Sequence, residues 1–219
     1  MQIDRDFERT VHLSNGQLVH IRLLRPGDER LLLEGFSNLS TEGRYQRFHG
    51  AVAELSPTWL HYLADVDQRD HIAVGAYSDT APQHGLGVAR CVRFPEDPTA
   101  AEVAVTVVDR AQHQGLGSML FGVLSVAAYE RGIQRFRACV LGSNANALSL
   151  IHGLTPLTSE HCSQGEVEIG MDVARIAESV ASLEGDHPGR ALLKLAAQGL
   201  VFRPPRSRMS ASPAPPAPH

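Results

Sequence analysis

The sequence is poor in the residues that mark several large classes of protein. Its three cysteines, Cys91, Cys139 and Cys162, are widely spaced and odd in number, which argues against a disulfide-rich domain and predicts free thiols in a reducing cytoplasm. No apolar run approaches the roughly 20 residues that span a bilayer, and the first residues are charged from Asp4, so no membrane span or signal peptide is predicted. Excess basic charge is also missing: the net charge is −4 and the pI about 6.2, which disfavours a nucleic-acid binder.

What the chain does have is enough apolar sequence for one ordinary domain. Its 219 residues are 43% hydrophobic and 20% charged, a globular profile. We predict a folded domain over 1–173, a helical extension over 174–201 and a tail over 202–219. The tail is rich in proline, alanine and serine, so it cannot pack a core and is predicted to be disordered.

Alternating and β-branched segments predict strands, and capping residues predict helices between them. The strands are expected over 9–13, 17–24, 71–77, 87–94, 101–108, 136–141 and 166–173. Asn15-Gly16 predicts a hairpin between the first two. Helices are expected after Asp28, Ser40, Ser56 and Gly142, and from about Leu116 to a C′ glycine at Gly132.

The loop between strand 101–108 and the next helix contains two glycines one residue apart, Gly115 and Gly117. A strand, a glycine turn and a helix together present free backbone N–H groups and a positive dipole end, which suits a phosphate. The alternative is an ordinary strand-to-helix turn. A similar HGLG at 84–87 runs into a strand, so it is interpreted as turn chemistry only.

Two common nucleotide loops do not fit this segment. No lysine follows the glycines as the Walker loop requires, and Leu120 stands where the dinucleotide fingerprint has its third glycine. The pattern that remains, Gln112-x-x-Gly115-x-Gly117, resembles the coenzyme-A loop of the GNAT N-acetyltransferase superfamily. His113 departs from the family, which more often has glycine there.

The resemblance covers roughly residues 10–173. The segment with Ser40, Arg44, Tyr45, Arg47 and Phe48 looks like the opening of bacterial protein-lysine acetyltransferase domains, and the stretch from strand 101–108 into its helix is similar to the mycobacterial cyclic-AMP-regulated type. Relatives carry a cyclic-nucleotide domain or an acyl-CoA-synthetase-like domain as well, for which this length leaves no room. The arginines and tyrosine of the segment either contact substrate or form a solvated helix with Phe48 inward.

The resemblance implies an α/β fold with a mixed, mainly antiparallel sheet flanked by helices. Strands 101–108 and 136–141 would be central and parallel and would splay apart around the pantetheine arm. It also implies a set of residues that bind acetyl-CoA: Val105, Val107, Gln112, Gln114, Gly115, Leu116, Gly117, Ser118, Met119 and Asn144. Asn144 is equally well explained as a helix N-cap.

The chemistry that the resemblance implies is acetyl transfer from a thioester to an amine. A lysine amine has a pKa near 10.4, so about one in a thousand is neutral at pH 7 and a base is needed. Glu102, the only acid in strand AEVAVTVV, is the candidate by position and by resemblance, with a backbone N–H near Val103–Val105 as oxyanion donor. Alternation places its side chain with those of Ala104 and Thr106. The alternative is a strand-end acid facing water.

Other roles are less defined by the sequence. His152 is the only titratable residue in its predicted helix and is either a general acid or a surface histidine. Cys139 lies inside a strand, so we expect direct transfer without a cysteine intermediate. Histidine and cysteine spacing is not typical of zinc, and no metal is predicted. The acceptor is a protein lysine or a small amine; a non-catalytic acetyl-CoA-binding module is a further alternative.

Overall fold

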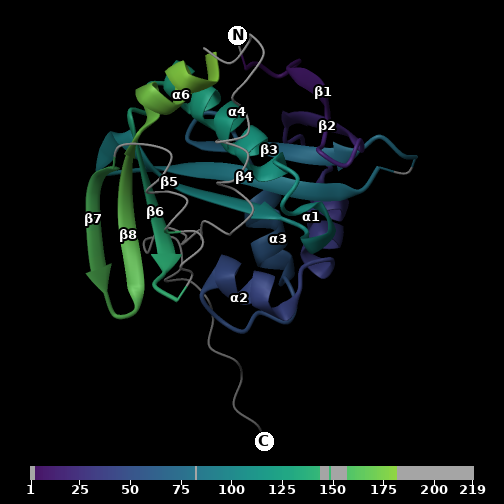
Figure 1. Ribbon diagram of the computed structural model, residues 1–219, viewed down its shortest axis with the longest axis horizontal. Helices are drawn as coiled ribbons and strands as arrows, with labels where there is room; N and C mark the ends of the chain where they lie inside the picture. The colour runs from purple at the N-terminus through teal and green to yellow at the C-terminus, as the bar shows by residue number, and fades with distance from the viewer. Residues whose placement is uncertain (1–2, 82, 144–147, 149–156, 182–219) are drawn as a thin grey trace, which may run out of the picture.

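The computed structural model describes residues 3–81, 83–143, 148 and 157–181, which form an eight-stranded sheet with helices on both faces (Figure 1). The strands are β1 (Glu8–His12), β2 (Leu18–Leu23), β3 (His71–Ser78), β4 (Gly85–Phe94), β5 (Asp97–Val107), β6 (Arg135–Leu141), β7 (Leu157–Ser163) and β8 (Glu166–Asp172). The helices are α1 (Glu29–Ser37), α2 (Thr41–Phe48), α3 (Pro57–Ala64), the short 3-10 turn η1 (Asp109–Ala111), α4 (Leu116–Glu130) and α6 (Val173–Ala181). None of the helices in these described ranges is long and apolar enough to cross a membrane.

The sheet is mixed and mainly antiparallel, as the sequence predicts. Its order is β1-β2-β3-β4-β5-β6-β8-β7, and only the central pair β5–β6 is parallel. That pairing is short, joining 100–102 to 135–137, although β5 continues to Val107 and β6 to Leu141. The two central strands therefore diverge, and the predicted splay is confirmed.

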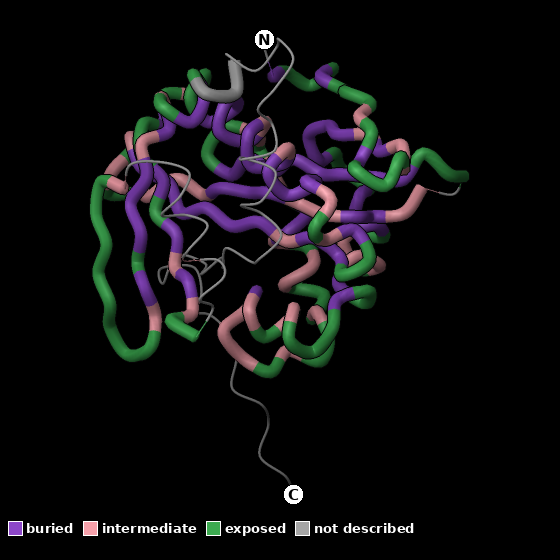
Figure 2. Tube along the Cα trace, viewed as in Figure 1, coloured by how far each residue is buried: buried purple, intermediate pink, exposed green. Residues whose placement is uncertain are grey.

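The helices are divided between the two faces of the sheet (Figure 1). On one face α4 packs along β3, β4 and α6, and the Phe121 ring of α4 lies 5.8 Å from that of Phe136 on β6. On the other face lie α1, α2 and α3, where the Arg90 side chain of β4 donates to the Leu63 carbonyl of α3. Figure 2 shows the buried strands between these layers, with β7 exposed along the outer edge.

Several local signals in the sequence are confirmed by hydrogen bonds. The β1–β2 hairpin turns through Gly16, whose φ is +84°. The hydroxyls of Ser40 and Ser56 accept from the backbone N–H groups of Gly43 and Trp59, so both serines cap their helices. Helix α4 ends at Glu130 with Arg131 as its C-cap, and Gly132 follows in the left-handed conformation, as a C′ glycine does.

Three predictions about strands are corrected. Strand β5 begins at Asp97 rather than 101, and the exposed strand β7 was not predicted at all. The HGLG at 84–87 is not a turn, because Gly85–Gly87 already belong to β4. Helix α1 explains the glycine: a Cβ at Gly85 would lie 2.5 Å from the Leu31 carbonyl oxygen.

The chain beyond β6 is described in part. The predicted helix from Gly142 to about 152, most of the extension over 174–201 and the tail over 202–219 lie outside the described residues. Helix α6 begins at Val173, where the domain boundary was placed, and its first turns pack into the core against α4. The predicted late strand ends one residue earlier, at Asp172.

Candidate active site

The N-terminus of α4 is built as an anion-binding end. Gly115 is its N-cap, with φ +87°, a conformation that favours glycine. In an α-helix the first four N–H groups have no partner within the helix, which here means those of Gly115, Leu116, Gly117 and Ser118. The Met119 N–H is the first to bond within the helix, donating to the Gly115 carbonyl, so any Met119 contact to a ligand would share that hydrogen.

Polar side chains of the loop between β5 and α4 stabilise its conformation by hydrogen bonds to backbone groups. The Gln112 side chain donates to the Val107 carbonyl at 3.0 Å, and the Gln114 side chain to the Arg110 carbonyl at 3.0 Å. The Asp109 carboxylate accepts from the Ser40 N–H, tying the loop to the start of α2. The side-chain N–H groups of both glutamines are thereby bonded to the backbone of the loop, whereas Gln114 Oε1 is buried without a hydrogen-bond partner among the described residues. The N–H groups of the following turn are left for a ligand.

Ser118 adds a polar side chain at the same end of the helix. The residue is 2% exposed, and its hydroxyl has no hydrogen-bond partner among the described residues. A buried hydroxyl without a partner is costly, since its desolvation is uncompensated. A ligand oxygen at the helix N-terminus would supply the missing partner.

The backbone of β5 offers groups toward the side where β6 diverges. The Gln134 N–H donates to the Thr99 carbonyl on the β6 side, and the Val108 N–H donates to Leu86 on the β4 side. Because backbone groups alternate in direction along a strand, Val103, Val105 and Val107 face the diverging side. The last pair with β6 is Glu102–Arg137, so within the described part of the chain Val105 and Val107 have no strand partner on that side. The Val107 carbonyl accepts from Gln112 instead.

Glu102 lies on the face of the sheet opposite α4. The register between β4 and β5 runs without a shift from Val107 to Ala101, so the alternation expected from the sequence holds. Glu102 is 9% exposed, which makes it a buried acid rather than a strand-end acid in water. Thr106 shares this face and lines a cavity beside it.

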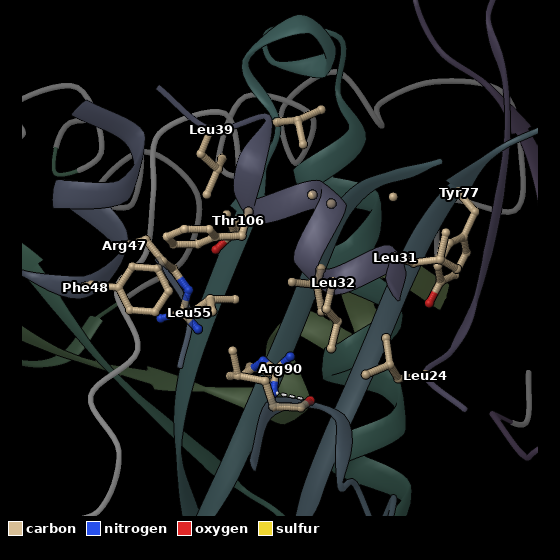
Figure 3. A pocket seen from close by; sticks show the side chains of 17 residues that line it. Leu24, Leu31, Leu32, Leu39, Arg47, Phe48, Leu55, Tyr77, Arg90 and Thr106 are labelled. Atoms are coloured by element: carbon tan, nitrogen blue, oxygen red, sulfur yellow. Dashed lines mark hydrogen bonds between the residues drawn. The ribbon is translucent and has the colours of Figure 1, made fainter. Parts of the chain in front are cut away.

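That cavity lies between α1, α2 and strands β4 and β5 and is open to solvent on one side; its empty space, including the open mouth, is about 620 Å³ (Figure 3). Its walls are mostly apolar, with Arg47 entering from α2 and Arg90 from β4. Burial lowers the pKa of Arg47 to about 9, with a further decrease from Arg90 and an opposing increase from Glu102. Arg47 therefore lies within electrostatic reach of both Arg90 and Glu102.

Arg90 is 1% exposed and only partly satisfied. One terminal nitrogen lies 2.9 Å from the Leu63 carbonyl and 3.0 Å from His71 Nε2, whereas Nε and Nη2 have no hydrogen-bond partner in the part of the chain that is described. Burial lowers the pKa of Arg90 to about 10. The cavity thus presents unused donors beside the candidate base. Arg90 could not be recognised as a site residue from the sequence, because the tertiary contacts of an arginine in a strand leave no local sequence pattern.

The α2 segment differs from the solvated helix considered above. Arg44 donates to three backbone carbonyls, those of Ser37, Leu39 and Ala53, so it holds the turn around α2. Tyr45 is exposed, but Arg47 is 5% exposed and faces the cavity. Phe48 packs inward against Phe36 and Trp59, as expected.

The structure brings most of the predicted site residues to one region. Glu102, Val105 and Val107 lie on β5, and the loop residues Gln112 to Met119 follow from its end. Asn144 and His152 lie outside the described residues, so their roles remain predictions. Among the described residues, the free N–H groups at the N-terminus of α4 are compatible with the diphosphate binding that the loop pattern implies.

The chain belongs to the acetyltransferase (GNAT) family, whose pattern matches residues 36–154. The members of this family are acetyltransferases, so acetyl-CoA is the donor that membership implies. This membership accounts for the diverging parallel strands and for the glycine loop before α4.

Individual relatives point to one branch of the family. Acetyltransferase Pat from Mycolicibacterium smegmatis is 39% identical over 134 residues, which are 61% of this chain and 40% of Pat. Acetyltransferase PA5475 from Pseudomonas aeruginosa is 31% identical over 124 residues, 56% of this chain and 66% of that protein. The GNAT domain of S. lividans PAT has a TM-score of 0.69 at 25% identity, covering 78% of this chain and 99% of that domain. The match spans less than half the length of M. smegmatis Pat, so only the catalytic part is shared.

Proposed function

We propose that this chain transfers the acetyl group of acetyl-CoA to the ε-amine of a protein lysine, with Glu102 as the general base. One observation carries the proposal. Along β5, the buried carboxylate of Glu102 is followed by backbone that is not paired with β6, and the loop after β5 leads to the N-terminus of α4.

The donor is held by backbone groups. The N–H groups of Gly115 to Ser118 bind the diphosphate, because the helix dipole and free donors coincide there, and the Ser118 hydroxyl finds its partner in a phosphate oxygen. Val105 and Val107 face the diverging side and border the pantetheine arm. Gln112 and Gln114 do not contact the donor; their side chains fix the conformation of the loop by hydrogen bonds to its backbone.

The reaction is a direct displacement. The amine nitrogen attacks the thioester carbonyl carbon, Glu102 takes a proton from the amine directly or through one water, and a backbone N–H near Val103–Val105 stabilises the oxyanion. The new C–N bond forms, the C–S bond breaks, and coenzyme A leaves as a thiolate that takes up a proton. Holding amine and thioester together on β5 removes the entropic cost of bringing them into contact.

A protein lysine is the acceptor that the relatives favour, since the matches include Pat acetyltransferases. We also propose a cytoplasmic location, because the three cysteines are all free thiols and a reducing compartment keeps them so.

The test is Glu102→Gln assayed with acetyl-CoA and a lysine-bearing protein. Loss of the base is expected to lower kcat about 10²–10⁴-fold, with acetyl-CoA affinity retained. Glu168→Gln is the matched control, because Glu168 is an exposed acid on β8. Turnover by Glu102→Gln within a few fold of the control would contradict the role of Glu102.

A second candidate acceptor is a small amine that carries a negative charge. The unused donors of Arg90, with Arg47 nearby, favour a carboxylate or phosphate in the cavity beside Glu102. Kinetics with free amino acids against lysine peptides separate the two: saturation by a carboxylate-bearing amine, without activity on peptides, would favour the small molecule.

A further inference from the structure

We propose that His49, Cys139 and Glu166 form a binding site for a thiophilic divalent cation, with Zn²⁺ as the best match. One ligand atom from each residue lies within 4.8 Å of the other two. His49 Nδ1 is 2.6 Å from one Glu166 carboxylate oxygen, and the Cys139 thiol donates to the other at 3.2 Å. None of the three residues lines the cavity beside Glu102 or belongs to the loop before α4.

Three distant segments supply these side chains. His49 is the C-cap of α2 and has a left-handed backbone, φ +49°, which turns the chain at the helix end. Cys139 lies on β6 beyond its pairing with β5, and Glu166 begins β8. The residues are too far apart in the chain for a recognisable spacing, which is why sequence analysis predicted no metal.

A second observation points to a ligand at this site. The side chain of His49 is 11% exposed, and its Nε2 atom is buried with no hydrogen-bond partner among the described residues. An imidazole has two nitrogens to satisfy, so hydrogen bonding to Glu166 alone leaves one of them without a partner. A metal bound at Nε2 would supply the partner that this atom lacks, while Nδ1 keeps its hydrogen bond to one Glu166 oxygen and the other oxygen is available to the metal. A histidine ligand whose second nitrogen bonds to a carboxylate is the usual arrangement.

The donor set determines which ion fits. Imidazole nitrogen, thiolate sulfur and carboxylate oxygen are the three ligand types that Zn²⁺ takes in proteins, and three protein ligands leave a fourth tetrahedral position for water or another group. Mg²⁺ and Ca²⁺ prefer oxygen alone and would not use the thiol. Binding replaces the thiol proton by the metal–sulfur bond, and that proton is released to solvent; no oxidation state changes.

The location gives the metal a structural consequence. Cys139 follows Arg137, which pairs with Glu102, so the cluster lies past the point where β5 and β6 diverge. The metal would join the end of α2 to β6 and β8. Because α2 also carries Arg47 and Phe48 into the cavity beside Glu102, the metal would fix one wall of that cavity.

Cobalt titration tests the site directly. Co²⁺ adopts tetrahedral sites and shows a thiolate-to-metal charge-transfer band only when a cysteine is a ligand. The full chain, freed of metal by a chelator, is expected to develop this band with one Co²⁺ per chain and to lose it when one equivalent of Zn²⁺ is added. Zn²⁺ is also expected to raise the thermal midpoint, because it binds the folded state.

Variants separate the site from other thiols. Cys139→Ser and His49→Gln are expected to lose the band and at least tenfold in Zn²⁺ affinity, whereas Cys162→Ser and His161→Gln, at exposed positions on β7, retain both. Circular dichroism confirms that each variant is folded. Absence of the band in the unmodified chain, its survival in folded Cys139→Ser, or its loss in Cys162→Ser would overturn the proposal and leave acetyl transfer unaffected.

Discussion

At the scale of single residues, the backbone conformation of His113 shows why the family more often has glycine at this position of the loop. Its φ is +58°, a left-handed conformation that costs a non-glycine residue roughly 1–2 kcal/mol. Glycine adopts it without that cost but loses more entropy on folding.

We therefore predict that His113→Gly stabilises the fold by about 0.5–1 kcal/mol, measured by urea unfolding. His113→Ala keeps the Cβ and is the control, for which no gain is expected. Equal stability of the glycine and alanine variants would show that the left-handed conformation carries no strain.

The charge of Asp28 stabilises the N-terminal half of the fold through an ion pair with Arg22. Its carboxylate accepts from both terminal nitrogens of Arg22 at 2.8 and 2.9 Å, in buried hydrogen bonds, and from the Arg25 N–H in a partly buried one. Asp28→Asn leaves the Arg22 charge buried without its partner, and we expect a loss of about 3–5 kcal/mol in the free energy of unfolding. Asp79→Asn, at an exposed acid, is the control and is expected to change stability by less than about 0.5 kcal/mol.

The same pair predicts a pH dependence. Burial alone would raise the pKa of Asp28, but the hydrogen bonds from Arg22 and Arg25 outweigh it, and the pKa is lowered. A lowered carboxyl pKa stabilises the fold above the unfolded value near 3.9 and is lost as pH falls through the folded value. The stability difference between wild type and Asp28→Asn is thus expected to be constant from pH 7 to about 5 and to narrow below about 4. A difference that widens in acid would contradict this sign.

At the scale of elements, the packing of α1 on β4 depends on Gly85. A Cβ there would lie 2.5 Å from the Leu31 carbonyl oxygen, closer than such contacts allow, and that oxygen belongs to backbone and cannot rotate away. We expect Gly85→Ala to destabilise the fold by about 1–3 kcal/mol. Gly35→Ala on the facing helix meets only an ordinary contact at 3.9 Å and is expected to be neutral or stabilising, because alanine favours a helix. Chemical denaturation of both variants compares them.

The N-terminus of α4 gives a prediction about binding rather than stability. Ser118→Ala removes a buried hydroxyl that has no partner among the described residues, so stability is expected to be unchanged or higher. Its affinity for coenzyme A is expected to fall about 3–10-fold, the effect of one net hydrogen bond. Ser125→Ala is the matched control, because Ser125 lies about two turns further along the helix and its hydroxyl is bonded to the Phe121 carbonyl; its affinity, measured by calorimetry, is expected to be unchanged. Equal affinities in the two variants would exclude Ser118 from the diphosphate site.

Elements with strong local signals were predictable, and those without them were not. Ser40 and Ser56 marked their helices because an N-cap is a property of a few adjacent residues. Strand β7 was missed because its residues are mostly exposed and polar, so no alternation shows, and only pairing with β8 makes it a strand. The beginning of β5 was missed because Pro98, the second residue of the strand, has no N–H to donate and so argues against a strand.

At the scale of the whole molecule, the residues proposed to bind acetyl-CoA can be proposed from the sequence more readily than those proposed to meet the acceptor. The loop from Gln112 to Gly117 is contiguous, so its pattern is visible in one line of sequence. The cavity instead joins Arg47, Arg90 and Glu102 from three elements, and the His49 cluster joins three more. Such contacts depend on tertiary packing, which no local spacing records.

The central claim is that backbone amides at the start of α4 hold a diphosphate and so place a thioester beside β5. Amide NMR spectra of the chain, titrated with coenzyme A and with pantetheine, test it most directly, because pantetheine lacks the diphosphate. The account predicts that the amide signals of Gly115, Leu116, Gly117 and Ser118 shift with coenzyme A and stay in place with pantetheine. Unmoved signals with coenzyme A, or equal shifts with both compounds, would contradict it.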